Sequence, residues 1–254
     1  ISTGSHEYIE TGKKTSKFGL DREAIRNISE LAMQSELTKI TTIASHIGSQ
    51  ISDESLILDS LDSMIEVAGE LQSAGHHIEN LDIGGGLGIK YKDENEGNPK
   101  ILIDKVKNRL KETDYKIILE PGRSVVASSG ILATKIEYIK EAGDKKFAII
   151  DAGMNDLIRP SLYKAWHRVR EVEIKDIESD TYDLAGPVCE TGDVLAKDRE
   201  LKILPDDYVV FMDVGAYGSV MASNYNSRLK PLELLVTGDK VNVIKRRESF
   251  EDLI

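Results

Sequence analysis

The stretch Leu81-Asp82-Ile83-Gly84-Gly85-Gly86-Leu87-Gly88 places a short apolar segment directly before a cluster of glycines. The apolar segment is typical of a buried strand, and the glycines predict a turn after it. Because glycines carry no side chains, the backbone N–H groups of such a turn can approach a phosphate. The spacing is not that of a dinucleotide-binding loop, and a glycine-rich turn that binds nothing is an equally open interpretation.

Two further strands are predicted to end in polar residues. The β-branched run 40–43 leads to His46-Ile47-Gly48-Ser49, and the run 115–119 leads to Glu120-Pro121-Gly122-Arg123. The interval from His46 to Gly84 is 38 positions and that from Gly84 to Glu120 is 36, so each fits one strand–helix unit. Ligands bind at such strand ends both in (β/α)8 barrels and in doubly wound sheets. The pattern therefore predicts an α/β unit with a site at these strand ends.

Helices are predicted between these strands. Asp21 can cap one helix, and a longer helix runs from about Asp53 to Gly75. Pro99 is placed to open a third helix. About three strand–helix units are therefore visible, whereas a closed barrel has eight, so either the sheet is open or residues precede Ile1.

The second half of the chain has a different pattern, beginning after about Gly130. Short runs of β-branched and aromatic residues alternate with glycine, proline and aspartate, which predicts an antiparallel β domain of sandwich or barrel type. We therefore divide the chain into residues 1–130, with α/β character, and residues 131–254, with all-β character. The runs that predict strands are 147–150, 169–174, 208–212 and 234–243.

Composition limits the class of protein. The 254 residues are 40% hydrophobic, enough for a large core, and no apolar run reaches the length of a membrane span. The first residues show no basic stretch followed by an apolar one, so no signal peptide is expected. The net charge of −11 disfavours nucleic acid as a partner. The one cysteine, Cys189, excludes an internal disulfide and favours a cytoplasmic location.

Several polar residues are candidates for chemistry, and each has a plainer interpretation. Glu120 could keep a ring nitrogen of a cofactor protonated and Arg123 could bind a phosphate or carboxylate, or the two could form an exposed ion pair. Taken by itself, Arg159 is interpreted as a surface charge rather than a ligand. Cys189 is interpreted as a small buried residue, with a thiol that delivers a proton as the alternative. Tyr217, which lies between two glycines, could present its hydroxyl at a cleft or pack at a bulge. His46 could simply be hydrogen-bonded in place.

The order of these stretches along the chain resembles the diaminopimelate decarboxylases, pyridoxal-phosphate enzymes of the alanine-racemase-like fold family. The resemblance runs from 6–12 and 16–20 to Arg228, and its specific parts are 155–163 and 189–193. It implies a (β/α)8 barrel followed by a β-sandwich-like domain, in a homodimer with active sites at the subunit interface. Here only the C-terminal strands and helices of the barrel would be present.

The resemblance also implies roles for the residues at the strand ends. His46 would stack on the pyridine ring, and Ser49 would contribute to holding the phosphate. The turn formed by Gly84, Gly85 and Gly86 would bind the phosphate. Glu120 would face the pyridine nitrogen, with Pro121 and Gly122 in the same cofactor-binding stretch. Arg123 would lie near both the phosphate and the substrate.

Residues of the second half are implied to recognise the substrate. Arg159, Tyr163 and Glu190 resemble the groups that bind the distal end of diaminopimelate, and Tyr217 the tyrosine that contacts phosphate and substrate. Cys189 resembles a proton donor that reaches the partner subunit's site. The implied reaction is decarboxylation of meso-2,6-diaminopimelate to L-lysine and CO2, the last step of lysine biosynthesis. We expect no metal ligands.

One element of the resemblance is missing, because the family's lysine that holds the cofactor lies on the first barrel strand and has no counterpart here. Tyr163-Lys164-Ala165 is superficially close but follows the Arg-Pro motif of the later domain. We therefore expect the sequence to begin inside the barrel and to be inactive as a lone chain. An ornithine- or arginine-type decarboxylase of the same fold, or a non-catalytic remnant or regulatory partner, are the alternatives.

Overall fold

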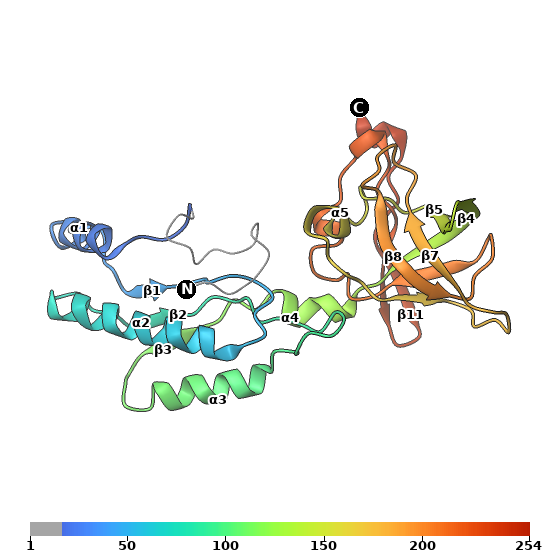
Figure 1. Cartoon of the computed structure of the whole chain (residues 1–254). Helices are drawn as coiled ribbons and strands as arrows, with labels where there is room; N and C mark the ends of the chain where they lie inside the picture. Colours follow the sequence, from blue (N-terminus) through green and yellow to red (C-terminus); the bar gives the residue numbers. More distant parts are fainter. Residues whose placement is uncertain (1–16) are drawn as a thin grey trace. The chain divides into compact units, whose positions relative to one another are not determined.

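The computed structural model describes residues 17–254, and the chain divides into two compact units, with the boundary in the sequence between Val125 and Val126 (Figure 1). The sequence pattern changes slightly later, after Gly130. Residues 6–12 and Ser16, quoted above for the resemblance, lie outside the described residues.

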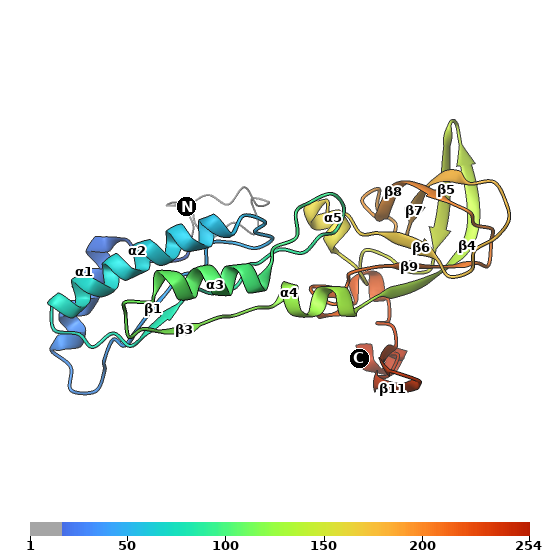
Figure 2. The ribbon, with the colours of Figure 1, turned by 90° about the horizontal axis from the view of Figure 1, so that it is seen from below.

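The first unit is built on a three-stranded parallel sheet in the order β1-β2-β3. The strands are β1 (Thr42–Ala44), β2 (Asn80–Asp82) and β3 (Lys116–Ile118). Helix α2 (Glu54–Ser73) connects β1 to β2, and helix α3 (Pro99–Arg109) connects β2 to β3. Figure 2 shows α2 and α3 on the same side of this sheet. The predicted α/β alternation is therefore confirmed.

Side chains cap the helices of this unit where the sequence predicts their starts. Asp21 accepts a hydrogen bond from the Ala24 N–H at 2.8 Å and opens α1 (Arg22–Met33). Asp53 accepts from the Ser55 N–H at 2.9 Å at the start of α2. Such caps satisfy N–H groups that have no partner within the helix. Asn98 caps α3 in the same way, with Pro99 at its first turn.

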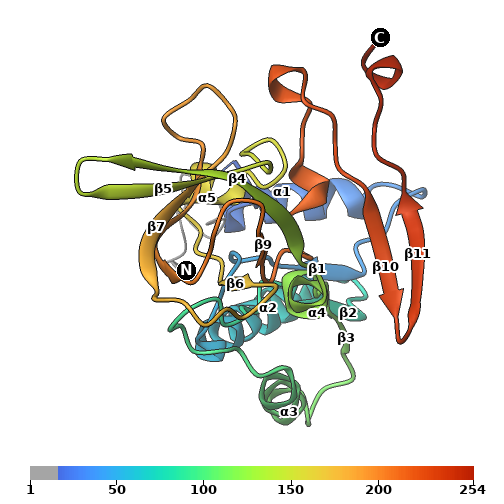
Figure 3. The ribbon, with the colours of Figure 1, turned by 90° about the vertical axis from the view of Figure 1, so that its right-hand side faces the viewer.

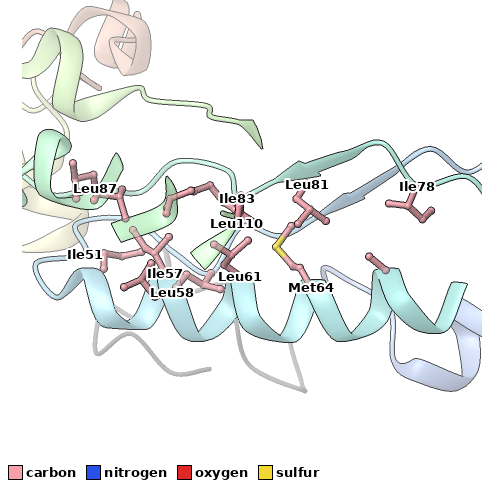
Figure 4. Packing of buried hydrophobic residues seen from close by; sticks show 14 of the residues in the cluster. Ile51, Ile57, Leu58, Leu61, Met64, Ile78, Leu81, Ile83, Leu87 and Leu110 are labelled. Atoms are coloured by element: carbon pink, nitrogen blue, oxygen red, sulfur yellow. The ribbon is translucent and has the colours of Figure 1, made fainter. Parts of the chain in front are cut away.

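The core of the first unit lies between α2 and the sheet. Ile57, Leu61 and Met64 recur on one face of α2 and are buried, and Met64 lies beside Leu81 of β2 (Figure 4). Burial of a large aliphatic side chain stabilises a fold by about 1.5–3 kcal/mol. This packing fixes β2, and with it the start of the glycine turn that follows.

The second unit contains a six-stranded sheet in the order β6-β9-β4-β5-β7-β8. Figure 3 labels β4, β5, β6, β7 and β9 of this sheet. Because β6 also contacts β8, the sheet is nearly closed. Its core is made of fully buried residues such as Phe211, Ile136 and Leu184. The strands are β4 (Leu132–Ala142), β5 (Lys145–Ile150), β6 (Val169–Glu171), β7 (Asp180–Ala185), β8 (Val194–Leu201) and β9 (Tyr208–Phe211).

The prediction that this sheet is entirely antiparallel is wrong. β5 and β7 pair in parallel, with Lys146 opposite Tyr182 and Ile149 opposite Ala185, so the sheet is mixed. The chain between them passes through a short helix and β6 before it returns, and a crossover of this length allows parallel pairing. Apolar runs indicate strands but carry no information about their direction.

A separate hairpin and several short helices complete the second unit. The predicted run 234–243 consists of two strands, β10 (Glu233–Thr237) and β11 (Lys240–Lys245), around a turn at Gly238 with φ +58°. No helix among residues 17–254 is both long and apolar enough to cross a membrane. Helix α4 (Arg123–Val126) spans the boundary between the two units, and the short helices of the second unit are η1 (Ala127–Ser129), α5 (Arg159–Tyr163), η2 (Ser219–Met221), η3 (Tyr225–Ser227) and η4 (Phe250–Leu253).

Candidate active site

The three loops that follow β1, β2 and β3 are joined by backbone hydrogen bonds. The Ser45 N–H donates to the Asp82 carbonyl at 2.8 Å, and the Ile83 N–H donates to the Ile118 carbonyl at 3.1 Å. Further along the loops after β2 and β3, the Glu120 N–H donates to the Gly84 carbonyl at 2.8 Å. The parallel ladder thus continues past the strands. It brings the segments of His46, Gly84 and Glu120 side by side, as the sequence predicts.

Glycine is required where these segments approach most closely. A Cβ atom on Gly85 would lie 2.1 Å from the Glu120 carbonyl oxygen, and one on Gly86 would lie 2.2 Å from the Gly48 carbonyl oxygen. Gly84 and Gly86 also have φ values of +67° and +96°, which other residues rarely adopt. The three glycines are therefore explained by backbone packing at the strand ends, whatever ligand the turn binds.

Two N–H groups of the glycine turn are used within the protein. The Gly84 N–H donates to Asp82 Oδ1 at 2.9 Å, and the Gly85 N–H donates to His46 Nδ1 at 3.3 Å. Since His46 Nδ1 accepts this hydrogen bond, its neutral ring carries the proton on Nε2. The imidazole itself is exposed.

Arg123 is buried and joins the loops after β1 and β2. Its Nη1 donates to the Tyr91 hydroxyl at 2.8 Å, and its Nη2 donates to Ser49 Oγ at 3.0 Å. The guanidinium carbon also lies 5.7 Å from the centre of the Tyr91 ring. An exposed ion pair between Glu120 and Arg123 is therefore excluded, because only Glu120 is exposed. Tyr91 was not expected here, since nothing in its local sequence marks it.

In the second unit, Arg159 lies at the start of α5 and is buried. Its Nη1 lies 2.7 Å from His167 Nε2, and His167 Nδ1 lies 2.9 Å from the Met212 carbonyl oxygen. Because a carbonyl only accepts and a guanidinium only donates, His167 carries its proton on Nδ1. The interpretation of Arg159 as a surface charge is wrong. Tyr163 is the last residue of the same helix and is half-buried.

The loop that carries Cys189 and Glu190 is held by a buried carboxylate. Asp193 Oδ2 accepts from the Val188 N–H at 2.7 Å, and Asp193 Oδ1 accepts from the Met154 N–H at 2.6 Å. Burial raises the pKa of Asp193 above its ordinary value. Cys189 is exposed, so its interpretation as a small buried residue is wrong. Asp193 thereby joins this loop to the segment that leads to Arg159.

Glu190 faces a small cavity in the second unit. The cavity has a volume of about 290 Å³ and is partly apolar. The Tyr225 hydroxyl donates a hydrogen bond to Glu190 Oε1, and this bond raises the pKa of Tyr225. Sequence reasoning did not single out Tyr225. The residues that line the cavity are Met154, Asn155, Ile158, Glu190, Ser223 and Tyr225.

Tyr217 adopts an unusual backbone conformation. Its φ is +59°, in the left-handed region that costs a residue with a side chain about 1 kcal/mol or more. The side chain is 40% exposed, so it is not packed away at a bulge. Nearby, a Cβ atom on Gly215 would lie 1.9 Å from the Val126 carbonyl oxygen. Close packing of the backbone thus explains the glycine, and the tyrosine is presented at the surface of its unit.

The candidate residues fall into one group in each unit. His46, Ser49, Gly84–Gly86 and Glu120–Arg123 belong to the first unit, and Arg159, Tyr163, Cys189, Glu190 and Tyr217 belong to the second. Among residues 17–254, no cluster of three or more histidine, cysteine or acidic side chains is suited to hold a metal ion.

Comparison with known proteins identifies the family. The family described as "Pyridoxal-dependent decarboxylase, C-terminal sheet domain" matches residues 27–215. The diaminopimelate decarboxylase of Pseudomonas aeruginosa is 41% identical over 253 residues, and that of Aquifex aeolicus is 44% identical over 256 residues. Each alignment covers 100% of this chain and 61% of the relative, so the chain spans about three fifths of the length of these proteins.

Solved structures agree with this match. The crystal structure of diaminopimelate decarboxylase from Helicobacter pylori, complexed with L-lysine, has a TM-score of 0.94 and 40% sequence identity to this chain. The match covers 100% of this chain and 63% of that one. Since the family match extends over most of the sequence and the fold agrees throughout, the chain belongs to the pyridoxal-dependent decarboxylases.

Proposed function

We propose that this chain forms part of a diaminopimelate decarboxylase, which converts meso-2,6-diaminopimelate to L-lysine and CO2 as the last step of lysine biosynthesis. The observation that carries the proposal is the junction of the three strand ends. It brings the loops of His46, Gly84–Gly86 and Glu120 side by side, with the buried Arg123 beside them. The names of the relatives support the choice of substrate.

The residues at these strand ends fit pyridoxal phosphate. Arg123 is buried and donates to Ser49, so a cation and a hydroxyl lie together, and these two groups would hold the phosphate. Close backbone packing leaves no room for side chains in the glycine turn. Glu120, next to Pro121 and Gly122, would hold the pyridine nitrogen, and His46 would cover one face of the ring. When bound, the pyridinium ring accepts electrons from the bond that breaks.

The second group of residues would bind the substrate and supply a proton. Arg159 would bind the distal carboxylate and Glu190 the distal ammonium, with Tyr163 and Tyr217 alongside, because an unpaired buried charge would be costly. In the reaction, the bond between the amino-bearing carbon and one carboxylate breaks and CO2 leaves. The Cys189 thiol would deliver the proton that takes its place on that carbon.

We also propose the wider architecture of the protein. Residues 1–130 would form the C-terminal part of a (β/α)8 barrel, and 131–254 the β domain. Helices α2 and α3 cover one side of a parallel sheet, as the helices of a barrel do (Figure 2). We propose a homodimer with active sites at the interface, because the exposed Cys189 loop would serve the partner subunit. A cytoplasmic location is consistent with a free thiol.

The experiment that tests the function measures CO2 release by the complete protein of which this chain forms part, loaded with pyridoxal phosphate. Diaminopimelate, ornithine, arginine and lysine are supplied separately at equal concentration. We expect release from diaminopimelate and formation of L-lysine in equal amount. Preferential release from ornithine or arginine would replace the substrate assignment, and no release from any of them would contradict the proposed activity.

A further inference from the structure

The hydrogen bond between Tyr225 and Glu190 links two residues that lie 35 positions apart in the chain. Glu190 belongs to the loop held by Asp193, and Tyr225 begins the short helix η3. Both side chains are exposed at the cavity, so a ligand can reach the carboxylate. The tyrosine hydroxyl therefore restricts the orientation of the carboxylate before any ligand binds.

The segment that carries Tyr225 is itself fixed. The Ser223 N–H donates to the Asn155 carbonyl at 2.9 Å, and the Tyr225 N–H donates to Ser223 Oγ at 3.4 Å. Arg228 Nε donates to Asn155 Oδ1 at 2.8 Å from the other side of η3. Asn155 is almost fully buried, so it forms a rigid base for the segment. The position of the tyrosine hydroxyl is thus set by the fold.

The lining of the cavity has two parts that suit an aliphatic amino acid. Met154 and Ile158 offer apolar surface for methylene groups, whereas Glu190 offers a negative charge for an ammonium. One oxygen of the Glu190 carboxylate accepts from Tyr225, and a carboxylate has further lone pairs for a second donor. The cavity can therefore take an ammonium group without giving up the tyrosine hydrogen bond.

We propose that Tyr225 is a positioning residue, which orients the Glu190 carboxylate toward the ammonium at the distal end of the substrate and so contributes to specificity. The inference rests on the proposed function and names a residue that contributes to specificity at one end of that site. Removing the hydroxyl would leave the carboxylate free to rotate. It should weaken ligands that carry the distal ammonium and spare those that lack it.

The test compares two inhibitors of the complete protein loaded with pyridoxal phosphate. In L-lysine the distal ammonium is the α-amino group, which lies next to the carboxylate. 6-Aminohexanoate lacks this α-amino group and keeps the carboxylate and the terminal amine. We expect Tyr225→Phe to weaken inhibition by L-lysine about tenfold, as expected for one hydrogen bond to a charged group, and to change inhibition by 6-aminohexanoate less than about twofold. The KM for diaminopimelate should rise by a similar factor while kcat changes little.

A double variant shows whether Tyr225 acts through Glu190. If it does, Tyr225→Phe should add nothing to the effect of Glu190→Gln on inhibition by L-lysine. Tyr138→Phe is the matched control, because Tyr138 is an exposed tyrosine on β4 of the same unit. This control should leave both inhibition constants and kcat unchanged.

The possible failures are distinct. If Tyr225→Phe weakens both inhibitors equally, or neither, the positioning role of Tyr225 is wrong even though the enzyme decarboxylates diaminopimelate. Additive effects of Tyr225→Phe and Glu190→Gln would also overturn it. If the unaltered enzyme releases no CO2 from diaminopimelate, the proposed function itself fails, independently of the variant.

Discussion

Arg159 Nη1 lies 2.7 Å from Nε2 of His167, whose side chain has no exposed surface. The imidazole serves two partners, because its Nδ1 donates to the Met212 carbonyl while its Nε2 accepts from the guanidinium. A neutral group thus fixes a buried cation in place. Arg159 is the residue proposed to bind the substrate's distal carboxylate, so its orientation depends on His167.

His167→Phe should destabilise the protein by about 2–4 kcal/mol, because it removes the hydrogen bonds that the imidazole makes to the buried Arg159 guanidinium and to the Met212 carbonyl. Urea unfolding measures the change. His77→Phe is the control, since the His77 side chain is 85% exposed, and it should change the free energy of unfolding by less than about 0.5 kcal/mol. Equal stability of the His167 variant and the original protein would contradict the role given to the imidazole.

Gly85→Ala should disrupt the junction of the three strand ends. The added Cβ would lie 2.1 Å from the Glu120 carbonyl oxygen, and backbone atoms cannot move away as a flexible side chain can. We expect a loss of at least about 2 kcal/mol of stability and weaker binding of pyridoxal phosphate, followed by its absorbance.

Gly69→Ala is the control for Gly85→Ala, because it is expected to stabilise the protein and not to destabilise it. Gly69 lies within α2 and nothing approaches its Cβ position within 4 Å. Alanine there should stabilise the protein by about 0.5–1 kcal/mol, because glycine disfavours helices. If the two alanine variants behaved alike, steric packing would not explain the glycine turn.

Local patterns predicted the first unit well. The caps at Asp21 and Asp53, the start at Pro99 and the strand before Gly84 depend on residues a few positions apart, and the structure confirms them. The equal spacing of the strand ends also predicted correctly that His46, Gly84 and Glu120 lie on adjacent loops. In a parallel sheet, such residues meet whenever successive strands are neighbours.

Features that depend on distant partners could not be predicted. The direction of β7 follows from a long crossover, and Arg123 is buried because Tyr91, 32 positions away, accepts from it. Likewise, Tyr225 reaches Glu190 only through the fold of the second unit. A single sequence carries no local signal for such contacts.

Asp193 gives a prediction for pH dependence. Burial raises its folded-state pKa above the unfolded value, so the folded protein binds this proton more tightly. Stability contributed by this group is therefore greatest below the unfolded pKa of about 3.8 and falls as pH rises through the raised pKa.

Asp193→Asn should remove this pH dependence of stability, and the substitution should also lower the stability of the protein. An amide offers one acceptor where the carboxylate serves the N–H groups of Val188 and Met154, so the variant should lose about 1–3 kcal/mol near neutral pH. The difference in unfolding free energy between the two proteins should shrink as pH rises from about 4. A difference that grows with pH would contradict the raised pKa.

Glu120→Gln tests the proposed partner of the pyridine nitrogen. A neutral amide cannot hold a proton on that nitrogen, so the rate of decarboxylation should fall at least about 100-fold. The folded state should be unaffected, because Glu120 is exposed. Glu112→Gln, an exposed change after α3, is the control. Near-normal activity of the Glu120 variant would remove this residue from the site.

Cys189→Ala separates proton delivery from cofactor binding. The thiol is exposed on a loop that Asp193 fixes, so its loss should leave both the fold and the absorbance of bound pyridoxal phosphate unchanged. Turnover should fall about 10²- to 10⁴-fold, as expected when a positioned proton donor is removed. Cys189→Ser keeps the size of the side chain but offers a much weaker acid, so it should be nearly as slow. A serine variant with full rate would mean that the group at this position acts through its shape, and a different residue would have to supply the proton.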